Sequence, residues 1–263
     1  MSKLQQAIYE LNRVENLQQS CDLANRLDAR GKLIVTLLYL ATMLSLPLTA
    51  LSRLLLFGLY PLVMCTLGGF GFLSLLRRSL YVLPFIALIA IFNPLYNHET
   101  AFMVGRWSIS QGWVSFFSIA VRGLLAVQAV MLLIYTTGFG PLCHAMQRMG
   151  LPSILSTQLL FVYRYMALLL QEALTMQRAR RARSFGRKGL TPKMAGTLVG
   201  ELLLRTVSRA EHIHCAMMAR GFTGRINYLH TLRWHSRDTL FVCLCALLFA
   251  LLRFLSLPIA PLL

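Results

Sequence analysis

The segment RAEHIHCAMMARGF, residues 209–222, holds two sets of side chains that suggest different chemistry. His212, His214 and Cys215 belong to the residue types that bind zinc and other transition metals. The four residues that close the segment, Ala-Arg-Gly-Phe, are typical of a helix C-terminus that presents an arginine to an anionic partner. The two interpretations imply different functions for the chain.

The spacing of the three metal-ligand residues argues against a metal site. On a helix, His212 and His214 lie about 200° apart, so their side chains cannot converge on one ion. His212 and Cys215 share a face, but two protein ligands are too few for a structural zinc site. We therefore interpret these residues as helix surface and predict no metal site in the chain.

A second helix end has a similar arginine pattern, in the segment ARSFG at residues 182–186. We predict two long helices here, 153 to about 184 and about 194 to 220, separated by Gly186, Gly189 and Pro192. On each helix, apolar residues spaced by three or four form one stripe, which continues to an arginine. The stripes are Val162, Tyr165, Leu169, Ala173 and Met176, continued by Arg180 and Arg183, and Leu203, Val207, Ala210, Ile213 and Met217, continued by Arg220.

Helix-end stabilisation is the alternative explanation for these arginines. A cation near a helix C-terminus interacts favourably with the helix dipole, and glycine commonly follows the last helical residue. This accounts well for one such ending and less well for two of similar sequence. A shared role of the two ends is therefore the hypothesis that we carry forward.

The elements that position these ends are those of a membrane protein. Of the 263 residues, 57% are hydrophobic and 13% are charged, whereas soluble domains are about 45–50% apolar and about 25% charged. The composition predicts an all-α, polytopic membrane protein with about five transmembrane helices and a cytoplasmic region of long amphipathic helices. Apolar runs long enough to cross a bilayer occur at 33–51, 54–76, 79–95, 112–137 and 239–257.

The net charge of +17 indicates membrane orientation rather than nucleic-acid binding. Most of the 26 Lys and Arg residues lie in the first 32 residues, at Arg77-Arg78 or between 138 and 238. Loops rich in Lys and Arg stay in the cytoplasm, and five spans place all three regions there. The predicted organisation is a cytoplasmic N-terminal segment (1–32), transmembrane helices 1–4 (33–137), a cytoplasmic coupling-helix region (138–238), and the last transmembrane helix with the C-terminus (239–263).

Two arginines constrain this topology. The segment 151–170 is apolar enough to be a sixth span, but that would place Arg164 at the centre of the hydrocarbon and the basic residues after 178 outside. We therefore predict a helix that lies low in the membrane or along its inner surface. Arg122, inside the predicted span 112–137, also needs a partner, which the sequence does not name.

The two arginine ends and their flanking residues resemble a family of transport proteins. The pair is similar to the two short Ala-Arg-Gly-type motifs of the transmembrane T component of energy-coupling-factor (ECF) transporters. Residues 205–224 resemble the cobalt/nickel branch, the CbiQ-like proteins, and Leu27–Lys32 is similar to that family's entry segment. Tyr163-Arg164-Tyr165 and Glu172 resemble the start of its first cytoplasmic helix.

The resemblance implies which residues couple the chain to ATPases. One departure concerns the first motif, which ends in Ser184 rather than glycine, and whose neighbourhood also offers Arg180. We take Arg183 as the first choice for the working arginine and Arg180 as the second. The implied coupling residues are Ala182, Arg183 and Ser184, with Arg180, and Ala219, Arg220 and Gly221.

The resemblance also implies the partners and the function. Two cytoplasmic ABC-type ATPase subunits would bind ATP and Mg²⁺, and a separate integral membrane subunit would bind cobalt or nickel. This chain would itself hold no cofactor and no catalytic residue, and would lie in a bacterial cytoplasmic (inner) membrane with its N-terminus in the cytoplasm. The same T component serving a vitamin such as biotin is the alternative.

A membrane-bound enzyme is an alternative from another class. An enzyme needs a poised acid, base or nucleophile, and residues 138–238 show no spacing typical of a triad. Glu201 is placed to pair with Arg205, four residues later on one helix, which is a structural role. The carboxylates of this region are Glu172, Glu201, Glu211 and Asp238.

Overall fold

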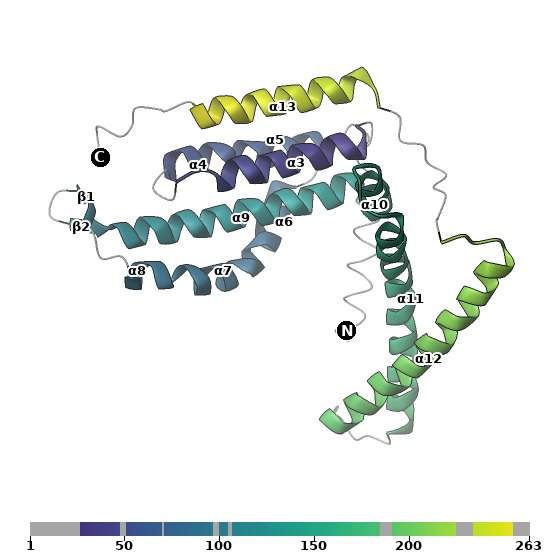
Figure 1. The fold of residues 1–263 in the computed structure, drawn as a ribbon. Coiled ribbons are helices and arrows are strands. Elements are labelled where there is room, and N and C mark those ends of the chain that lie inside the picture. Colours follow the sequence, from purple (N-terminus) through teal and green to yellow (C-terminus); the bar gives the residue numbers. More distant parts are fainter. Residues whose placement is uncertain are drawn as a thin grey trace. The chain divides into compact units, whose positions relative to one another are not determined.

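Helices make up almost all of the regular structure in the computed structural model (Figure 1). The predicted all-α membrane class is thereby confirmed. The chain divides into two compact units, one within Phe139–Thr231 and the other made of the described residues of Gln18–Gly138 and Leu232–Leu263. The structure describes residues 27–47, 51–69, 71–96, 100–104, 107–184, 191–224 and 234–254.

In the larger unit, the helices surround one long central helix, α9 (Gln111–Thr137), which contacts most of the others. In the same unit, α3 (Ala29–Leu44) packs on α13 (Ser236–Phe254). The remaining elements are α4 (Leu51–Phe57), α5 (Leu59–Leu67), α6 (Phe72–Ser79), η1 (Leu80–Val82), α7 (Leu83–Ala90), α8 (Phe92–Tyr96), β1 (Thr100–Val104) and β2 (Trp107–Ser110).

Aromatic side chains from four helices form the centre of this unit. Tyr39 of α3 stacks on Tyr60 of α5 with ring centroids 4.5 Å apart, and its hydroxyl donates to the Phe57 carbonyl at 3.1 Å. Phe249 of α13 lies against the same cluster, with its ring centroid 5.5 Å from that of Tyr39. Because the phenolic hydroxyl has a partner, the ring of Tyr39 can be fully buried without an unsatisfied polar group.

Hydrogen bonds bring several charged residues to one end of the unit. Lys32 Nζ donates to the Thr136 carbonyl at 2.7 Å, and Arg78 Nη1 donates to Tyr135 Oη at 2.7 Å. Both contacts lie in the last turn of α9, so the start of α3 and the region of Arg77-Arg78 share one end. The predicted orientation, with both basic regions on the same side, requires this arrangement.

The same end is closed by Asp238, which is 1% exposed. Its Oδ1 accepts a hydrogen bond from the Asp28 backbone N–H, and its Oδ2 accepts one from the His235 N–H, each at 2.9 Å. One carboxylate therefore joins the beginning of α13 to the beginning of α3, and the two helices run in parallel.

The structure differs from the predicted spans 54–76 and 79–95. The helical run breaks at Gly68-Gly69 and resumes at Phe72, instead of breaking at Arg77-Arg78. Gly69 has φ +67°, a conformation that glycine adopts without a steric penalty and that ends α5. Arg78 can lie inside a helix because Tyr135 accepts a hydrogen bond from its guanidinium.

Three helical runs among the described residues are long and apolar enough to cross a membrane. They are Phe72–Pro94, Gly112–Thr137 and Ser153–Arg183, and Arg53–Leu67 is a shorter apolar helix. The first differs from the predicted span 79–95 because it includes α6. The third includes residues 153–170 of the segment that is predicted to lie low in the membrane or along its inner surface.

The residues between α8 and α9, predicted as a loop outside the membrane, include two strands. β1 and β2 pair antiparallel, with Val104 opposite Trp107. Their sequences, TAFMV and WSIS, are rich in aromatic and β-branched residues, which favour extended structure.

Arg122 of α9 has the partner that the sequence could not name. Its Nη2 donates to the carbonyls of Leu46, at 3.1 Å, and of Pro47, at 3.3 Å. These carbonyls follow the end of α3, which stops at Leu44 rather than at the predicted residue 51. Arg122 thus donates to backbone carbonyls that follow a helix end and have no partner within a helix, and these carbonyls in turn stabilise a cation inside a predicted span.

The second unit contains α10 (Phe139–Arg148), α11 (Ser153–Arg183) and α12 (Pro192–Ala219). α11 and α12 match the predicted helices, 153 to about 184 and about 194 to 220, to within two residues. α10 packs on the beginning of α11, where Ser156 Oγ donates to the Cys143 carbonyl at 3.1 Å. Phe139 and Tyr163 stack there with ring centroids 4.6 Å apart.

Candidate coupling site

The positions at which the two long helices, α11 and α12, begin and end follow from the local sequence. α11 has 31 residues and begins directly after Pro152. α12 has 28 residues and begins with Pro192, which suits the first helical position because its missing N–H has no helical partner there. At a rise of about 1.5 Å per residue, each helix is more than 40 Å long.

α12 crosses α11, with the middle of α12 against the second half of α11 (Figure 1). A cluster of four charged residues lies at the crossing. Glu172 of α11 contacts Arg205 of α12 at 3.1 Å and Arg209 at 3.7 Å. Within α12, Glu201 contacts Arg205 at 2.9 Å, as its spacing predicts. Hydrogen bonds to Glu201 and to Glu172 raise the pKa of the Arg205 guanidinium, so it remains charged.

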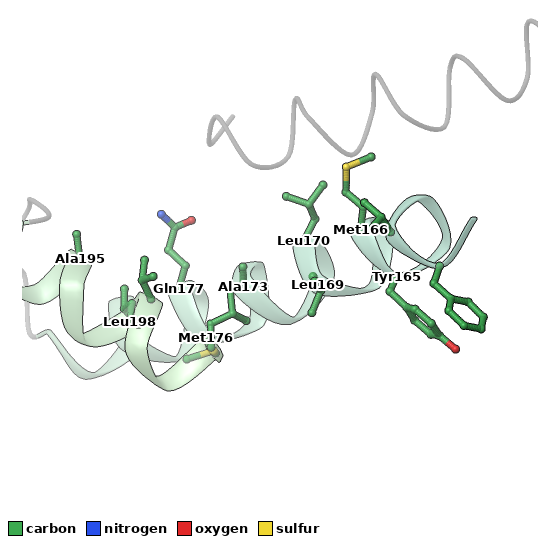
Figure 2. Close-up of a pocket in the computed structure, with 13 residues that line it drawn as sticks. Tyr165, Met166, Leu169, Leu170, Ala173, Met176, Gln177, Ala195 and Leu198 are labelled. Atoms are coloured by element: carbon green, nitrogen blue, oxygen red, sulfur yellow. The ribbon is translucent and has the colours of Figure 1, made fainter. Parts of the chain in front are cut away.

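An apolar groove of about 730 Å³, which we call groove A, lies between α11 and the first half of α12. Figure 2 shows Ala195 and Leu198 of α12 with Met176 and Gln177 of α11 in this groove. The whole predicted stripe of α11 lines it, which confirms that these residues share one face. The stripe residues are Val162, Tyr165, Leu169, Ala173 and Met176.

A second apolar groove of about 540 Å³, groove B, lies between the other half of α12 and the beginning of α11. Four residues of the predicted α12 stripe line it: Val207, Ala210, Ile213 and Met217. The fifth, Leu203, does not line it and is 61% exposed. Leu203 therefore does not belong to the groove-lining face, and the α12 stripe is shorter than the periodicity predicts.

Arg220 occupies the C-cap of α12 in a well-formed helix end. The Phe222 N–H donates to the Met217 carbonyl and the Gly221 N–H to the Met218 carbonyl, both at 3.0 Å. With Gly221 at φ +79°, this is the Schellman arrangement, which requires a left-handed residue after the cap. Glycine is therefore needed here for conformational reasons, and Arg220 is exposed beside it.

The end of α11 is built differently. Ser184 has φ −86°, and both its N–H and its hydroxyl bond to the Arg181 carbonyl. The serine hydroxyl thus satisfies a carbonyl that a Schellman glycine would otherwise help to satisfy. Arg183 is exposed at this end, whereas Arg180 is half-buried. The two arginines that the sequence left open therefore differ in accessibility.

The two arginine ends lie far apart along the crossed pair. Phe222, just after Arg220, lies beside Phe161 near the beginning of α11, with ring centroids 6.4 Å apart. Arg183 is at the other end of α11, 22 residues after Phe161, which corresponds to about 33 Å of helix. The sequence predicts each end separately but does not predict this separation.

The metal-ligand residue types of α12 point in different directions, as their spacing predicts. His214 lines groove B, whereas His212 borders the charged cluster at the crossing. Cys215 is exposed. Among the residues that the structure describes, no three His, Cys, Asp or Glu side chains are grouped to hold a metal ion.

Comparison with known proteins agrees with this architecture. The family model for the CbiQ cobalt transport protein matches residues 22–230, which include both arginine ends and the crossing. The chain belongs to the CbiQ family. It is therefore a component of a membrane transporter.

Two proteins of Methanocaldococcus jannaschii are similar to this chain. The uncharacterized protein MJ1571 is 26% identical over 240 residues, covering 88% of this chain and 82% of the relative. The uncharacterized protein MJ1089 is 28% identical over 138 residues, covering 51% of each chain. Neither name adds a substrate.

Sequence reasoning missed the contact between Glu172 and the two arginines of α12. The i to i+4 spacing reveals the Glu201–Arg205 pair, but Glu172 is 33 positions before Arg205 and on another helix. The sequence signal for Glu172 was its resemblance to a position of the family, and this resemblance does not indicate which residues Glu172 contacts. The partner becomes evident only from the way the helices cross.

Proposed function

We propose that this CbiQ-family chain is the T component of an ATP-driven ECF-type importer. It would couple two cytoplasmic ABC-type ATPase subunits, which bind ATP and Mg²⁺, to a separate membrane subunit that binds the substrate. The observation that carries the proposal is the crossed pair of α11 and α12, with exposed Arg183 and Arg220 at opposite ends. Two separated cationic ends suit two separate anionic partners.

Each arginine end would dock in a groove on one ATPase and meet a carboxylate there. A hydrogen bond between charged groups is worth about 1.5–3 kcal/mol, and arginine adds planar, two-pronged geometry. Ala182 and Ala219, directly before the two arginines, are small and exposed, which lets a partner surface approach each helix end. The proposed coupling residues are Ala182, Arg183 and Ser184, with Arg180 as the second choice for the working arginine, and Ala219, Arg220 and Gly221.

The apolar faces of the crossed pair would bind the substrate-binding membrane subunit and the inner surface of the bilayer. α12 has no buried residue in the described structure, and Val199 and Leu204 are 66% and 69% exposed. Faces of this kind usually mark an interaction surface. Motion of the ATPases would reach the substrate subunit through these faces.

We propose that α11 lies along the inner surface although its length would allow it to cross. Arg164 is exposed on α11, and the cluster around Glu172 lies near the middle of the helix. Charged groups at the middle of a span are costly in hydrocarbon, whereas amphipathic helices with charged faces are stable at the interface. We further propose that residues 138–238 and the N-terminus lie in the cytoplasm, at a bacterial inner membrane, as the distribution of Lys and Arg residues and the family resemblance predict.

Cobalt or nickel is the proposed substrate, supported by the cobalt transport family that the chain matches. The metal would bind to the partner membrane subunit rather than to this chain. The same T component serving a vitamin such as biotin is the competing assignment. Co-purification of the partner subunit and its identification by mass spectrometry separate the two.

The test of the coupling role is docking of the ATPases. We expect Arg220→Ala and Arg183→Glu each to weaken co-purification of the ATPase and metal uptake, because each removes one charged contact worth about 2–5 kcal/mol when its partner is left buried and unpaired. Membrane insertion should be unchanged. Arg181→Glu is the matched control, because position 181 lies about 200° around the helix from position 183. Wild-type co-purification and uptake in both variants would refute the assignment.

A further inference from the structure

The polar contacts described between α11 and α12 converge on one carboxylate. Glu172 Oε1 lies 3.1 Å from Arg205 Nη1, and Glu172 Oε2 lies 3.7 Å from Arg209 Nη2. Arg205 and Arg209 are one helical turn apart on α12, so both face the same point of α11. Each oxygen of the carboxylate therefore contacts a different guanidinium.

Around this contact, the described side chains at the crossing make no other directional interaction between the two helices. Grooves A and B lie on either side of it, and both are lined mainly by apolar side chains. Apolar contacts stabilise helix packing but are not directional, so they tolerate sliding and rotation. Charged hydrogen bonds depend on distance and angle, and they select one register.

We propose that Glu172 is a positioning residue that fixes where α11 and α12 cross, and thereby fixes the separation of Arg183 and Arg220. The inference rests on the proposed coupling function and adds a residue that touches neither the ATPases nor the substrate. Because α12 is a continuous helix, a shift of one turn at the crossing, about 5.4 Å, moves its arginine end by the same distance. Two ATPases can dock on the two helix ends at the same time only if the distance between the ends is fixed.

The chain offers a matched control in Glu201. Glu201 and Glu172 both contact Arg205, but Glu201 lies on the same helix as Arg205. Glu201→Gln removes the same charge from the same cluster and leaves the contact between the helices in place. Glu172→Gln removes the charge from both contacts between the helices, and its amide nitrogen cannot accept a hydrogen bond from an arginine.

The experiment measures the separation of the helix ends directly. Spin labels are attached at Ala179 and Ala216, both exposed and near the two ends, in a chain whose six cysteines have been replaced. Pulsed electron–electron double resonance is recorded on the purified chain with its ATPases. We expect one narrow distance distribution for the parent and for Glu201→Gln, and a broadened or shifted one for Glu172→Gln.

Transport in the otherwise native chain is the second readout. We expect Glu172→Gln to lower uptake about fivefold, the order expected from losing two partly exposed charge contacts, and Glu201→Gln to lower it less than twofold. Reversal of all four charges, with Glu172→Arg, Glu201→Arg, Arg205→Glu and Arg209→Glu, re-forms every pair with opposite sign. This variant should recover a narrow distance distribution and most of the uptake, whereas Glu172→Arg alone should not.

The outcomes separate this inference from the coupling proposal. If Glu172→Gln matches Glu201→Gln in both distance and uptake, while Arg220→Ala still co-purifies less ATPase than the wild type, the positioning role is wrong and the coupling role stands. If the four-charge reversal remains as broad and inactive as Glu172→Arg, the pairing is not what positions the helices. If Arg220→Ala and Arg183→Glu both retain the ATPase, the coupling proposal itself has failed.

Discussion

A buried lysine needs a partner, and Lys32 finds it in the last turn of α9. The side chain is 3% exposed, and its Nζ donates to the Thr136 carbonyl at 2.7 Å. This carbonyl is one of the last four of α9, which have no acceptor role within the helix. A cation at this position also interacts favourably with the negative end of the helix dipole. Lys32 therefore ties the first turn of α3 to the last turn of α9.

Lys32→Met tests this role at the scale of one residue. Methionine keeps much of the apolar stem but cannot donate, so the Thr136 carbonyl loses its hydrogen bond. We expect the variant to be less stable by about 1–3 kcal/mol, seen as a lower unfolding temperature of the purified protein in detergent. Lys193→Met is the control, because Lys193 is exposed. Equal unfolding temperatures for the two variants would show that Lys32 does not stabilise this contact.

At the scale of elements, α7 and α9 approach closely because a glycine faces an isoleucine. A Cβ at Gly123 of α9 would lie 2.6 Å from Ile86 Cδ1 and 3.0 Å from Ile86 Cγ2. Both distances are shorter than a van der Waals contact. Small residues at helix interfaces permit such packing in membrane proteins.

Gly123→Val should force these helices apart. We expect destabilisation of about 1–3 kcal/mol from overpacking, measured as the unfolding temperature in detergent. Adding Ile86→Ala should restore part of the loss, since it removes the atoms that clash. Gly196→Val on α12 is the control, because no atom lies within 4 Å of a Cβ placed there. Failure of Ile86→Ala to restore stability would argue that the loss does not arise at this contact.

The helices of the crossed pair could be predicted from sequence, because their periodicity and their glycine and proline boundaries are strong local signals. The break at Gly69 was not predicted. Arg77-Arg78 gave the stronger signal for a loop, and its interaction with Tyr135 depends on a residue 57 positions later. Local patterns therefore locate helices well, but they fail where a distant partner satisfies a charge.

The candidate site shows the same division between local and distant information. Exposure of Arg220 beside Gly221 follows from a helix-end motif that is written in consecutive residues. The greater exposure of Arg183 than of Arg180, and the distance between the two ends, depend on how α11 and α12 cross. That crossing involves Glu172 and Arg205, which only the folded chain brings together.

At the scale of the whole molecule, the distance between the two arginine ends limits how they can bind a partner. About 33 Å of helix separates Phe161, beside the Arg220 end, from Arg183, too far for both arginines to enter one small pocket. If each end docks its own ATPase subunit, the occupancy of the two sites can be changed independently. Independent occupancy of the two sites would distinguish a scaffold for two ATPases from a chain that binds a single partner through one basic surface.

The number of ATPase subunits bound per chain tests this arrangement. Without nucleotide, we expect native mass spectrometry of complexes purified through this chain to show two ATPases for the wild type and one for Arg220→Ala. The combination of Arg183→Glu with Arg220→Ala should bind none, because both charged contacts are lost. Arg181→Glu should keep two, since its side chain points away from the Arg183 face. If Arg220→Ala alone released both subunits, or neither, the two helix ends would not be independent docking sites.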